Sequence, residues 1–216
     1  MKKIASPLFQ DLSEAELDTL AAAGHLRTRQ FAKHEVIFRA GSCVREIGIV
    51  LRGSVHIENL DLWGTKSILS SVGAGQAFAE TYAFCGEALM VDAVAAEHCE
   101  ILFLHTAALT DARIEPALQD KLLRRLLAVS MRKNLSLSQR IFCTTPKTVR
   151  GRLLTYFSAQ AAHCGRMEFD VPFNRQQMAD YLNLDRSALS KELCKMRDEG
   201  LLEFDKNRFV LKQLPE

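Results

Sequence analysis

Apolar residues recur at helical spacing in two short segments near the C-terminal end of this chain. The apolar positions of the first lie between Met178 and Leu182, and those of the second between Leu189 and Met196. The first segment includes Ala179, which is small enough to let a second helix cross closely. The pattern predicts two amphipathic helices that pack against each other through these faces.

Residues that begin and end helices flank both segments. Asn174 and Gln177 form a capping-box pattern at the start of the first helix, and Asp185 is expected to cap the second. Asn183 tolerates the left-handed backbone that a tight turn requires, and Gly200 is expected to end the second helix. The stretch from residue 174 to residue 202 is therefore predicted to be a helix-turn-helix.

The polar face of the second helix carries side chains that donate hydrogen bonds. Base edges and phosphates are rich in acceptors, so we expect this face to enter the major groove of DNA. Its residues are Arg186, Ser187, Ser190, Lys191 and Lys195. The alternative is an ordinary helical domain in which such a face is only solvated.

Two short alternating runs follow the helices, at residues 201–204 and 208–211, and predict a β-hairpin with Lys206 at its tip. Before the helices, residues 169–173 alternate in the same way and include Pro172, which is typical of an edge strand. Hairpin, edge strand and helices together predict a winged helix-turn-helix, with Lys206 near the DNA backbone.

The first half of the chain has a different pattern. From Lys33 to Leu104, short apolar runs are interrupted by glycines at hairpin spacing, which predicts an antiparallel barrel or jelly roll. The runs are residues 36–38, 47–51, 55–57 and 101–104, and the glycines are Gly41, Gly53, Gly64, Gly73 and Gly75. A short capped helix is predicted ahead of them, from Asp11 to Ala23. We call the predicted winged helix-turn-helix the reader. A small β-barrel joined to such a DNA-binding part suggests a sensor protein.

A long helix is predicted between these parts, from Pro116 to Phe142, with Pro146 beyond its end. Its apolar surface is wider than packing on one domain requires, so we expect a parallel coiled coil with a second copy of the chain. The residues assigned to dimerisation are Leu118, Leu122, Leu126 and Val129, with Leu123, Leu127, Met131 and Leu135 beside them. The alternative is a helix packed only between its own two domains.

These elements predict an α+β fold in three parts. Residues 1–112 would form an effector-sensing β-barrel with its N-terminal helix, residues 113–143 the dimerisation helix, and residues 144–216 the winged helix-turn-helix. No stretch approaches the roughly 20 apolar residues of a membrane span, and the N-terminus lacks the apolar core of a signal peptide. We therefore expect a cytoplasmic protein.

Charge and cysteine content refine this picture. Residues 136–216 hold 13 Lys and Arg against 10 Asp and Glu, whereas residues 1–135 hold 15 against 16, so the basic excess lies with the predicted DNA reader. The six cysteines are scattered and include no C-x-x-C pair. We expect reduced, mostly buried thiols rather than a disulfide framework, and no bound metal.

The order of these parts resembles the CRP/FNR family, the family of the catabolite activator protein, over roughly residues 8–211. The most specific stretches are Gly53–Val55, Phe78–Glu80, Asn174–Gln177 and Arg186–Lys191. The resemblance implies a homodimeric transcriptional regulator that binds a palindromic DNA operator and acts with RNA polymerase.

The resemblance also implies roles for individual residues. Arg186 and Lys191 match positions that read bases, and Asn174, Arg175 and Gln176 match positions that contact phosphates. The chain departs from the family pattern at three positions in this region: Asp185, Ser187 and Glu192.

Each departure has a different consequence. Ser187 stands where several relatives carry a glutamate that accepts a hydrogen bond from cytosine, so the base preference there is expected to differ. Asp185 replaces a phosphate-binding serine and is better explained as a helix cap. Glu192 occupies a position that is usually apolar, and nothing in the sequence explains it.

The effector site departs further. Relatives that bind cyclic AMP use a glutamate for the ribose, a role that Glu80 fits, and an Arg-Ser pair for the phosphate. Met90 and Val91 occupy the positions of that pair, and burying the anion unpaired would cost several kcal/mol. We therefore expect a small-molecule effector other than cyclic AMP.

The expected effector pocket is mainly apolar, with one carboxylate and one phenol, which suits a small and partly apolar organic ligand. Its residues are Phe78, Glu80, Thr81, Tyr82, Phe84, Leu89, Met90 and Val91. The alternative is a barrel without an effector that serves as a scaffold for dimerisation and for contact with RNA polymerase.

Cofactors are not expected. An iron–sulfur cluster would require cysteines near the N-terminus, and the first is Cys43. Residues 79–82 contain neither Cys nor His for a haem, although His98, Cys99 and Cys85 keep haem as an alternative.

Two other functional classes are an enzyme and a sensory module that does not bind DNA. The histidines fall in no catalytic or metal-binding spacing and no glycine-rich phosphate loop precedes a helix, so we expect no enzymatic activity. A small-molecule or haem-binding sensory module that signals through protein contacts is the alternative function. Operator binding would differ from it by weakening steeply with salt.

Overall fold

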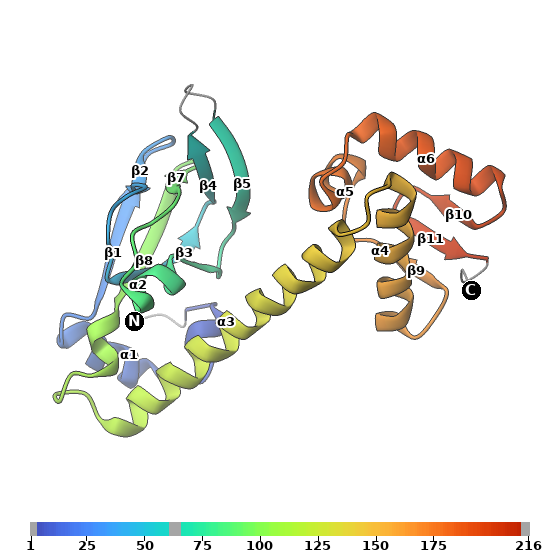
Figure 1. The fold of residues 1–216 in the computed structure, drawn as a ribbon. Coiled ribbons are helices and arrows are strands. Elements are labelled where there is room, and N and C mark those ends of the chain that lie inside the picture. Colours follow the sequence, from blue (N-terminus) through green and yellow to red (C-terminus); the bar gives the residue numbers. More distant parts are fainter. Residues whose placement is uncertain (1–3, 61–65, 213–216) are drawn as a thin grey trace. The chain divides into compact units, whose positions relative to one another are not determined.

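The computed structural model describes residues 4–60 and 66–212, and the chain divides into two compact units, residues 1–132 and 133–216 (Figure 1). The N-terminal unit is built mainly of β-strands and the C-terminal unit mainly of helices, which confirms the predicted α+β class. The long helix α3 (Pro116–Thr144) contributes to both units. The predicted three-part division, with boundaries after residues 112 and 143, stays a prediction.

The N-terminal unit contains two four-stranded antiparallel sheets, with strand orders β1-β8-β3-β6 and β2-β7-β4-β5. This topology confirms the predicted jelly roll. The strands are β1 (Leu26–Phe31), β2 (Val36–Phe38), β3 (Glu46–Arg52), β4 (Val55–Leu60), β5 (Lys66–Val72), β6 (Ala77–Phe78), β7 (Asp92–Ala95) and β8 (Cys99–His105).

Aromatic side chains fill the space between the two sheets. Phe38 from one sheet lies 5.8 Å from Phe78 and 5.7 Å from Phe103 of the other, measured between ring centroids. A Cβ atom on Gly48 would lie only 2.2 Å from the Phe78 ring, so glycine is required at this point of β3. The interior of the barrel is therefore packed tightly around Phe78.

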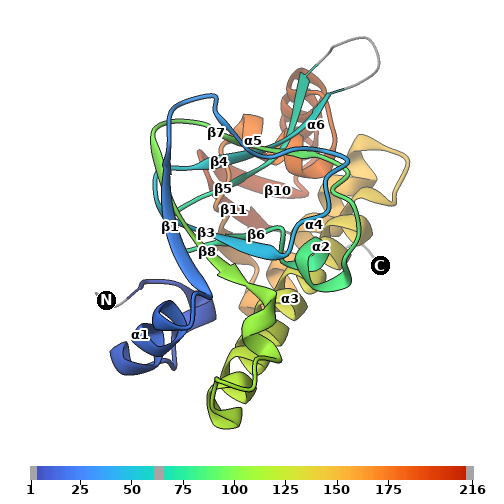
Figure 2. The same ribbon diagram turned by 90° about the vertical axis from the view of Figure 1, so that its left-hand side faces the viewer.

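Helices cover the outer face of the first sheet. Leu17 and Leu20 of α1 (Glu14–Ala22) form one buried cluster with Leu118 and Leu122 of α3 and with apolar residues of β3 and β8. Figure 2 shows α1 and the first part of α3 at the same end of these strands. Because this sheet is covered on both faces, β3 and β8 read as nearly continuous apolar runs. The short elements η1 (Pro7–Phe9), α2 (Glu80–Cys85) and η2 (Thr106–Leu109) complete the unit.

The same packing corrects the residues assigned to dimerisation. Leu118, Leu122 and Leu126 are 3%, 1% and 7% exposed because they belong to the core of their own unit, and Val129 is half-buried. These leucines therefore cannot present a surface to a second chain. The exposed apolar side chains of α3 are Leu123, Leu127, Met131, Leu135, Leu137, Ile141 and Phe142.

The C-terminal unit packs three helices against a three-stranded antiparallel sheet of order β10-β11-β9. Its elements are α4 (Val149–Cys164), β9 (Glu168–Asp170), α5 (Arg175–Leu182), α6 (Arg186–Asp198), β10 (Leu202–Asp205) and β11 (Arg208–Leu211). The hairpin, the edge strand β9 and the helix pair confirm the predicted winged helix-turn-helix. The helix α4 was not predicted, although Thr148 caps its start and Gly165 ends it.

Two further sequence expectations can be compared with the structure. Cys99 and Cys143 are buried, whereas Cys43, Cys85, Cys164 and Cys194 are exposed, so the expectation of mostly buried thiols was wrong. Among the helices within residues 4–60 and 66–212, none is long and apolar enough to cross a membrane.

Candidate nucleic-acid interface

The two helices of the reader begin and end where their capping residues predict. The side chain of Asn174 accepts a hydrogen bond from the Gln177 N–H, and the Gln177 side chain accepts one from the Asn174 N–H, both at 2.9 Å. Asn183 adopts the left-handed conformation with φ 54°. The capping box and the turn are thus confirmed, and they set the direction in which α6 leaves α5.

Asp185 caps α6, as expected. Its Oδ1 accepts hydrogen bonds from the N–H groups of Ser187 and Ala188, each at 2.9 Å, and from the Ser187 hydroxyl at 2.5 Å. The hydrogen bond from the Ser187 side chain is the main reason that the pKa of Asp185 lies below its usual value. The carboxylate is therefore occupied within the helix cap.

Burial separates the two faces of α6. Leu189, Leu193 and Met196 are 0% exposed and pack in the core of the unit. The opposite face carries the predicted contact residues, of which Ser190 is half-buried and the others are exposed: Arg186, Ser187, Lys191 and Lys195. The polar face of α6, which is rich in hydrogen-bond donors, is therefore accessible to a ligand such as DNA.

A recess at one end of the helix pair brings residues from three elements together. It is lined by residues from the start of α5, from the start of α6 and from the turn of the hairpin: Asn174, Arg175, Gln176, Arg186, Lys206 and Asn207. Lys206 lies at the tip between β10 and β11, as predicted, with φ 49°. Lys191 and Lys195 line a second recess beside the start of α4.

The side chains assigned to phosphate contacts are engaged within the unit. The Arg175 guanidinium lies 4.9 Å from the ring centroid of Phe204 and 5.0 Å from that of Phe209, and burial lowers its pKa. The Gln176 side chain donates to Asp180 at 2.8 Å. Asn174 is held in the capping box, so none of the three side chains is free of contacts within the unit. A phosphate at this end of α5 would therefore interact mainly with the helix N-terminus.

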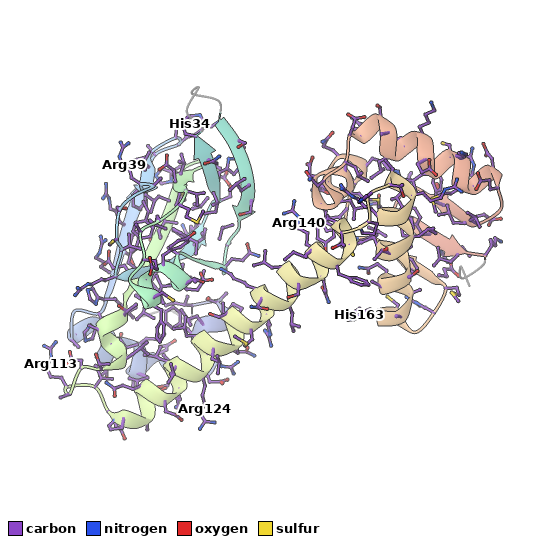
Figure 3. All side chains as sticks on the ribbon, in the orientation of Figure 1. His34, Arg39, Arg113, Arg124, Arg140 and His163 are labelled. Carbon is purple, nitrogen blue, oxygen red and sulfur yellow. The ribbon has the colours of Figure 1, made fainter. Side chains whose placement is uncertain are left out.

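Two arginines that were not predicted hold the turn of the helix pair. Arg140 lies near the end of α3 (Figure 3). Its guanidinium donates to the carbonyls of Tyr181 and Asp180 at 3.0 and 2.9 Å. Arg152 of α4 donates to the carbonyls of Leu182 and Asn183 at 3.1 and 2.7 Å. The last carbonyls of α5 thus bind cations, which suits the negative end of a helix dipole.

Arg150 explains the charge at Glu192. Its guanidinium bonds to the carboxylate of Glu192 at 2.6 Å and to that of Glu199 at 2.9 Å, and these bonds raise the pKa of Arg150. Glu192 therefore fastens α6 to the start of α4 instead of packing in the core. An acidic residue at an apolar position of a helix was the only sequence signal for this contact.

Replacing Arg152 with alanine is expected to loosen the reader. Arg152 also donates to the Pro146 carbonyl at 2.8 Å, so its loss removes charged hydrogen bonds both to the segment before α4 and to the end of α5. We expect the unfolding free energy of the C-terminal unit to fall by about 1.5–3 kcal/mol, measured by urea denaturation. Arg166→Ala, at an exposed position after α4, removes the same charge and should leave stability unchanged within about 0.5 kcal/mol.

A separate apolar recess lies in the N-terminal unit, between α2 and α3. It is lined by Glu80, Thr81, Phe84, Cys85, Leu123, Leu126, Leu127 and Ser130. Three of the predicted effector residues lie here, namely Glu80, Thr81 and Phe84, and Glu80 is buried. The α3 side of this recess was missed because its residues are distant in sequence.

The other predicted effector residues lie elsewhere. Phe78 packs between the sheets, Leu89 is buried, and Met90 is 77% exposed, so these three do not line the recess between α2 and α3. Tyr82 and Val91 are half-buried and are also absent from its lining. Within the described parts of the chain, no group of His, Cys, Asp and Glu side chains is arranged to hold a metal ion.

Comparison with known proteins agrees with this architecture. A family model described as cyclic nucleotide-binding domain matches residues 28–113, and one described as Crp-like helix-turn-helix domain matches residues 151–216. The catabolite activator protein of Thermus thermophilus is similar in structure, with a TM-score of 0.50 and 24% identity over 96% of this chain and 94% of that chain. No curated protein matches the sequence.

Two other solved structures are similar, one over most of the chain and one over its N-terminal part. CprK complexed with OCPA has a TM-score of 0.64 and 14% identity over 91% of this chain and 92% of that chain. The N-terminal domain of a transcriptional regulator from Streptomyces coelicolor A3(2) has a TM-score of 0.51 and 20% identity over 61% of this chain and 92% of that chain.

A cyclic nucleotide-binding β domain and a winged helix-turn-helix, carried by one chain with a long helix, define a DNA-binding transcriptional regulator. The chain belongs to the CRP/FNR family. Members of this family are transcriptional regulators rather than enzymes.

Proposed function

We propose that this protein is a cytoplasmic, homodimeric regulator that binds a palindromic operator through the exposed face of α6, under control of a small-molecule effector other than cyclic AMP. The observation that carries the proposal is the donor-rich face of α6. This face lies opposite a fully buried apolar stripe and next to the wing, which is the hairpin of β10 and β11. Two such helices related by a twofold axis fit half-sites about one helical turn, ~34 Å, apart. Its output would be exerted on RNA polymerase at the promoter.

The exposed apolar residues of α3 support the dimer. Six positions follow one another at intervals of four and three residues, the spacing of a coiled-coil seam: Leu123, Leu127, Ser130, Asn134, Leu137 and Ile141. Their four apolar side chains are 46–66% exposed, more than a monomer would be expected to leave open along one helix. A polar residue such as Asn134 within a seam sets the register of the two helices. This seam, and not the buried leucines of the same helix, is the proposed dimer interface.

The recess between α2 and α3 supports the effector assignment. Its lining combines four apolar side chains with the carboxylate of Glu80 and the hydroxyls of Thr81 and Ser130, and contains no lysine or arginine. A cyclic phosphate would therefore lack a cation to neutralise its negative charge. An uncharged or cationic organic molecule needs no such cation and could bind in the recess.

The same recess supports a coupling between effector and dimer. Leu123, Leu127 and Ser130 line the recess and also belong to the proposed seam. A ligand in the recess would thus contact the surface on which the second helix packs and would favour one pairing of the helices over another. Arg140, on the same helix, bonds to the turn of the reader and would carry a change of α3 to α5.

Cyclic AMP is expected not to bind, because the recess offers its phosphate no cation. Isothermal calorimetry should detect no micromolar binding, and a dissociation constant in that range would contradict the proposal. In a thermal-shift screen of uncharged and cationic metabolites, an effector at 100 times its dissociation constant should add about 2.7 kcal/mol of stability. Ser130→Phe, which fills the recess, should abolish the shift of any compound found.

Operator binding is tested by selection from random DNA duplexes. We expect the protein to enrich a palindrome with half-sites one helical turn apart, and the affinity for it to fall steeply between 50 and 200 mM salt, conditions that weaken phosphate contacts. Failure to enrich any duplex, with and without a metabolite mixture, would overturn the proposed function.

A further inference from the structure

We propose that Asp185 fixes the Ser187 hydroxyl as a hydrogen-bond acceptor, so that Ser187 selects an amino base, cytosine or adenine, at one position of each half-site. The inference rests on the proposed operator binding and adds to it the residue pair that sets one base preference.

The hydrogen of the Ser187 hydroxyl is already used within the protein. Its Oγ donates to Oδ1 of Asp185 at 2.5 Å, the same oxygen that accepts the N–H groups of Ser187 and Ala188 at 2.9 Å. A carboxylate only accepts hydrogen bonds, so the proton must come from the serine. Hydrogen bonds from hydroxyl to carboxylate are short and strong, which holds the hydroxyl in this orientation.

The side of Ser187 left for DNA therefore carries lone pairs only. A serine hydroxyl has one hydrogen and two lone pairs, and an unrestrained one rotates to donate or to accept. Both Ser187 and Asp185 are exposed, at the start of α6 beside Arg186. Because arginine only donates, neighbouring positions 186 and 187 present opposite hydrogen-bonding character to the groove.

An acceptor in the major groove distinguishes the two strands of a base pair. Cytosine and adenine present an amino donor there, whereas guanine and thymine present a carbonyl oxygen. Ser187 should thus favour cytosine or adenine on the strand that it faces and disfavour guanine or thymine, whose oxygen would meet its lone pairs. Asp185 acts as the positioning residue, because its Oδ1 accepts the hydrogen bond that orients the Ser187 hydroxyl.

The experiment is selection from random duplexes with the full-length wild-type protein and three variants. Ser187→Ala identifies the position, because its preference alone should become flat. Asp185→Gly keeps most of the helix cap's stability but removes the acceptor, which frees the hydroxyl to rotate. Asp185→Asn keeps an acceptor oxygen at the same place and is the matched control.

We expect the wild type and Asp185→Asn to favour cytosine or adenine at that position by about 3- to 10-fold, the contribution of one hydrogen bond. Asp185→Gly should reduce this preference to less than about 2-fold. It should keep the base preferences of the wild type at all other positions of the operator, which would show that the variant is folded.

Three results would overturn the inference and leave operator binding intact. They are a wild-type preference for guanine or thymine at the Ser187 position, an unchanged preference in Asp185→Gly, and no position that responds to Ser187→Ala. If the wild type enriches no sequence at all, the proposed function fails instead.

Discussion

Leu137→Glu is expected to convert the protein to a monomer and to abolish tight operator binding. Leu137 is 61% exposed on α3 and lies at the centre of the Asn134–Ile141 part of the proposed seam. In a dimer, two glutamates would face each other in an apolar interface, at a cost of several kcal/mol. A free-energy change of about 1.4 kcal/mol changes a dissociation constant tenfold. We therefore expect the dissociation constant of the dimer to rise by at least about 100-fold.

The loss of the dimer should reduce DNA binding further than the loss of any single contact. Two linked readers bind two half-sites with an effective concentration that a monomer lacks, which is worth about 10²- to 10⁴-fold in affinity. Sedimentation velocity measures the oligomeric state, and a mobility-shift assay with the selected operator measures the affinity.

A matched control is available one residue away. Ser136 is exposed and lies outside the seam, so Ser136→Glu adds the same charge to the same helix. It should remain dimeric and bind the operator like the wild type. If Leu137→Glu sediments as the wild type does at micromolar concentration, the seam is not the dimer interface.

Arg186→Ala is expected to weaken operator binding and to relax one base preference. Arg186 is exposed at the first position of α6 and lines the recess shared with the wing. An arginine that contacts guanine through two hydrogen bonds contributes about 1–3 kcal/mol per half-site, or about 5- to 150-fold. The affinity for operators mutated at that base pair should change little, since the contact is already absent.

Two other variants separate base reading from charge. Arg166→Ala removes one charge from the same unit at an exposed position after α4 and should bind the operator normally. Lys206→Ala, at the tip of the hairpin, should weaken binding to all sequences equally. The slope of the logarithm of the affinity against the logarithm of the salt concentration should fall by about 1, the contribution of one phosphate contact. Unchanged binding of Arg186→Ala to its operator would refute the base-reading role.

Local sequence signals predicted the reader closely. Capping residues, a left-handed asparagine and a buried stripe act over a few residues, so Asn174, Asn183 and Asp185 could be assigned without knowledge of the fold. The same holds for the strands β2, β3 and β4, whose apolar runs and flanking glycines lie next to each other in the chain, and for the continuous apolar run of β8.

Contacts between distant segments could not be predicted in this way. Arg140 and Arg152 are ordinary charged residues in the sequence, and only the folded unit brings them to the carbonyls at the end of α5, 30 to 41 residues away. The charge of Glu192 is explained only by Arg150, which lies beside it in the folded unit although the two are 42 residues apart in the sequence. Charged side chains show no periodicity that would reveal their partners.

The sequence by itself determined the class of each unit, the ends of the reader helices and the surface that we propose faces DNA, because these depend on periodicity and capping within short segments. Only the tertiary structure decided which leucines of α3 are free. Two apolar stripes lie side by side on this helix, and the pattern does not say which one the β unit covers. The structure buries Leu118, Leu122 and Leu126 against that unit and leaves Leu123 and Leu127 exposed, since a helix presents only one face to the sheet on which it packs.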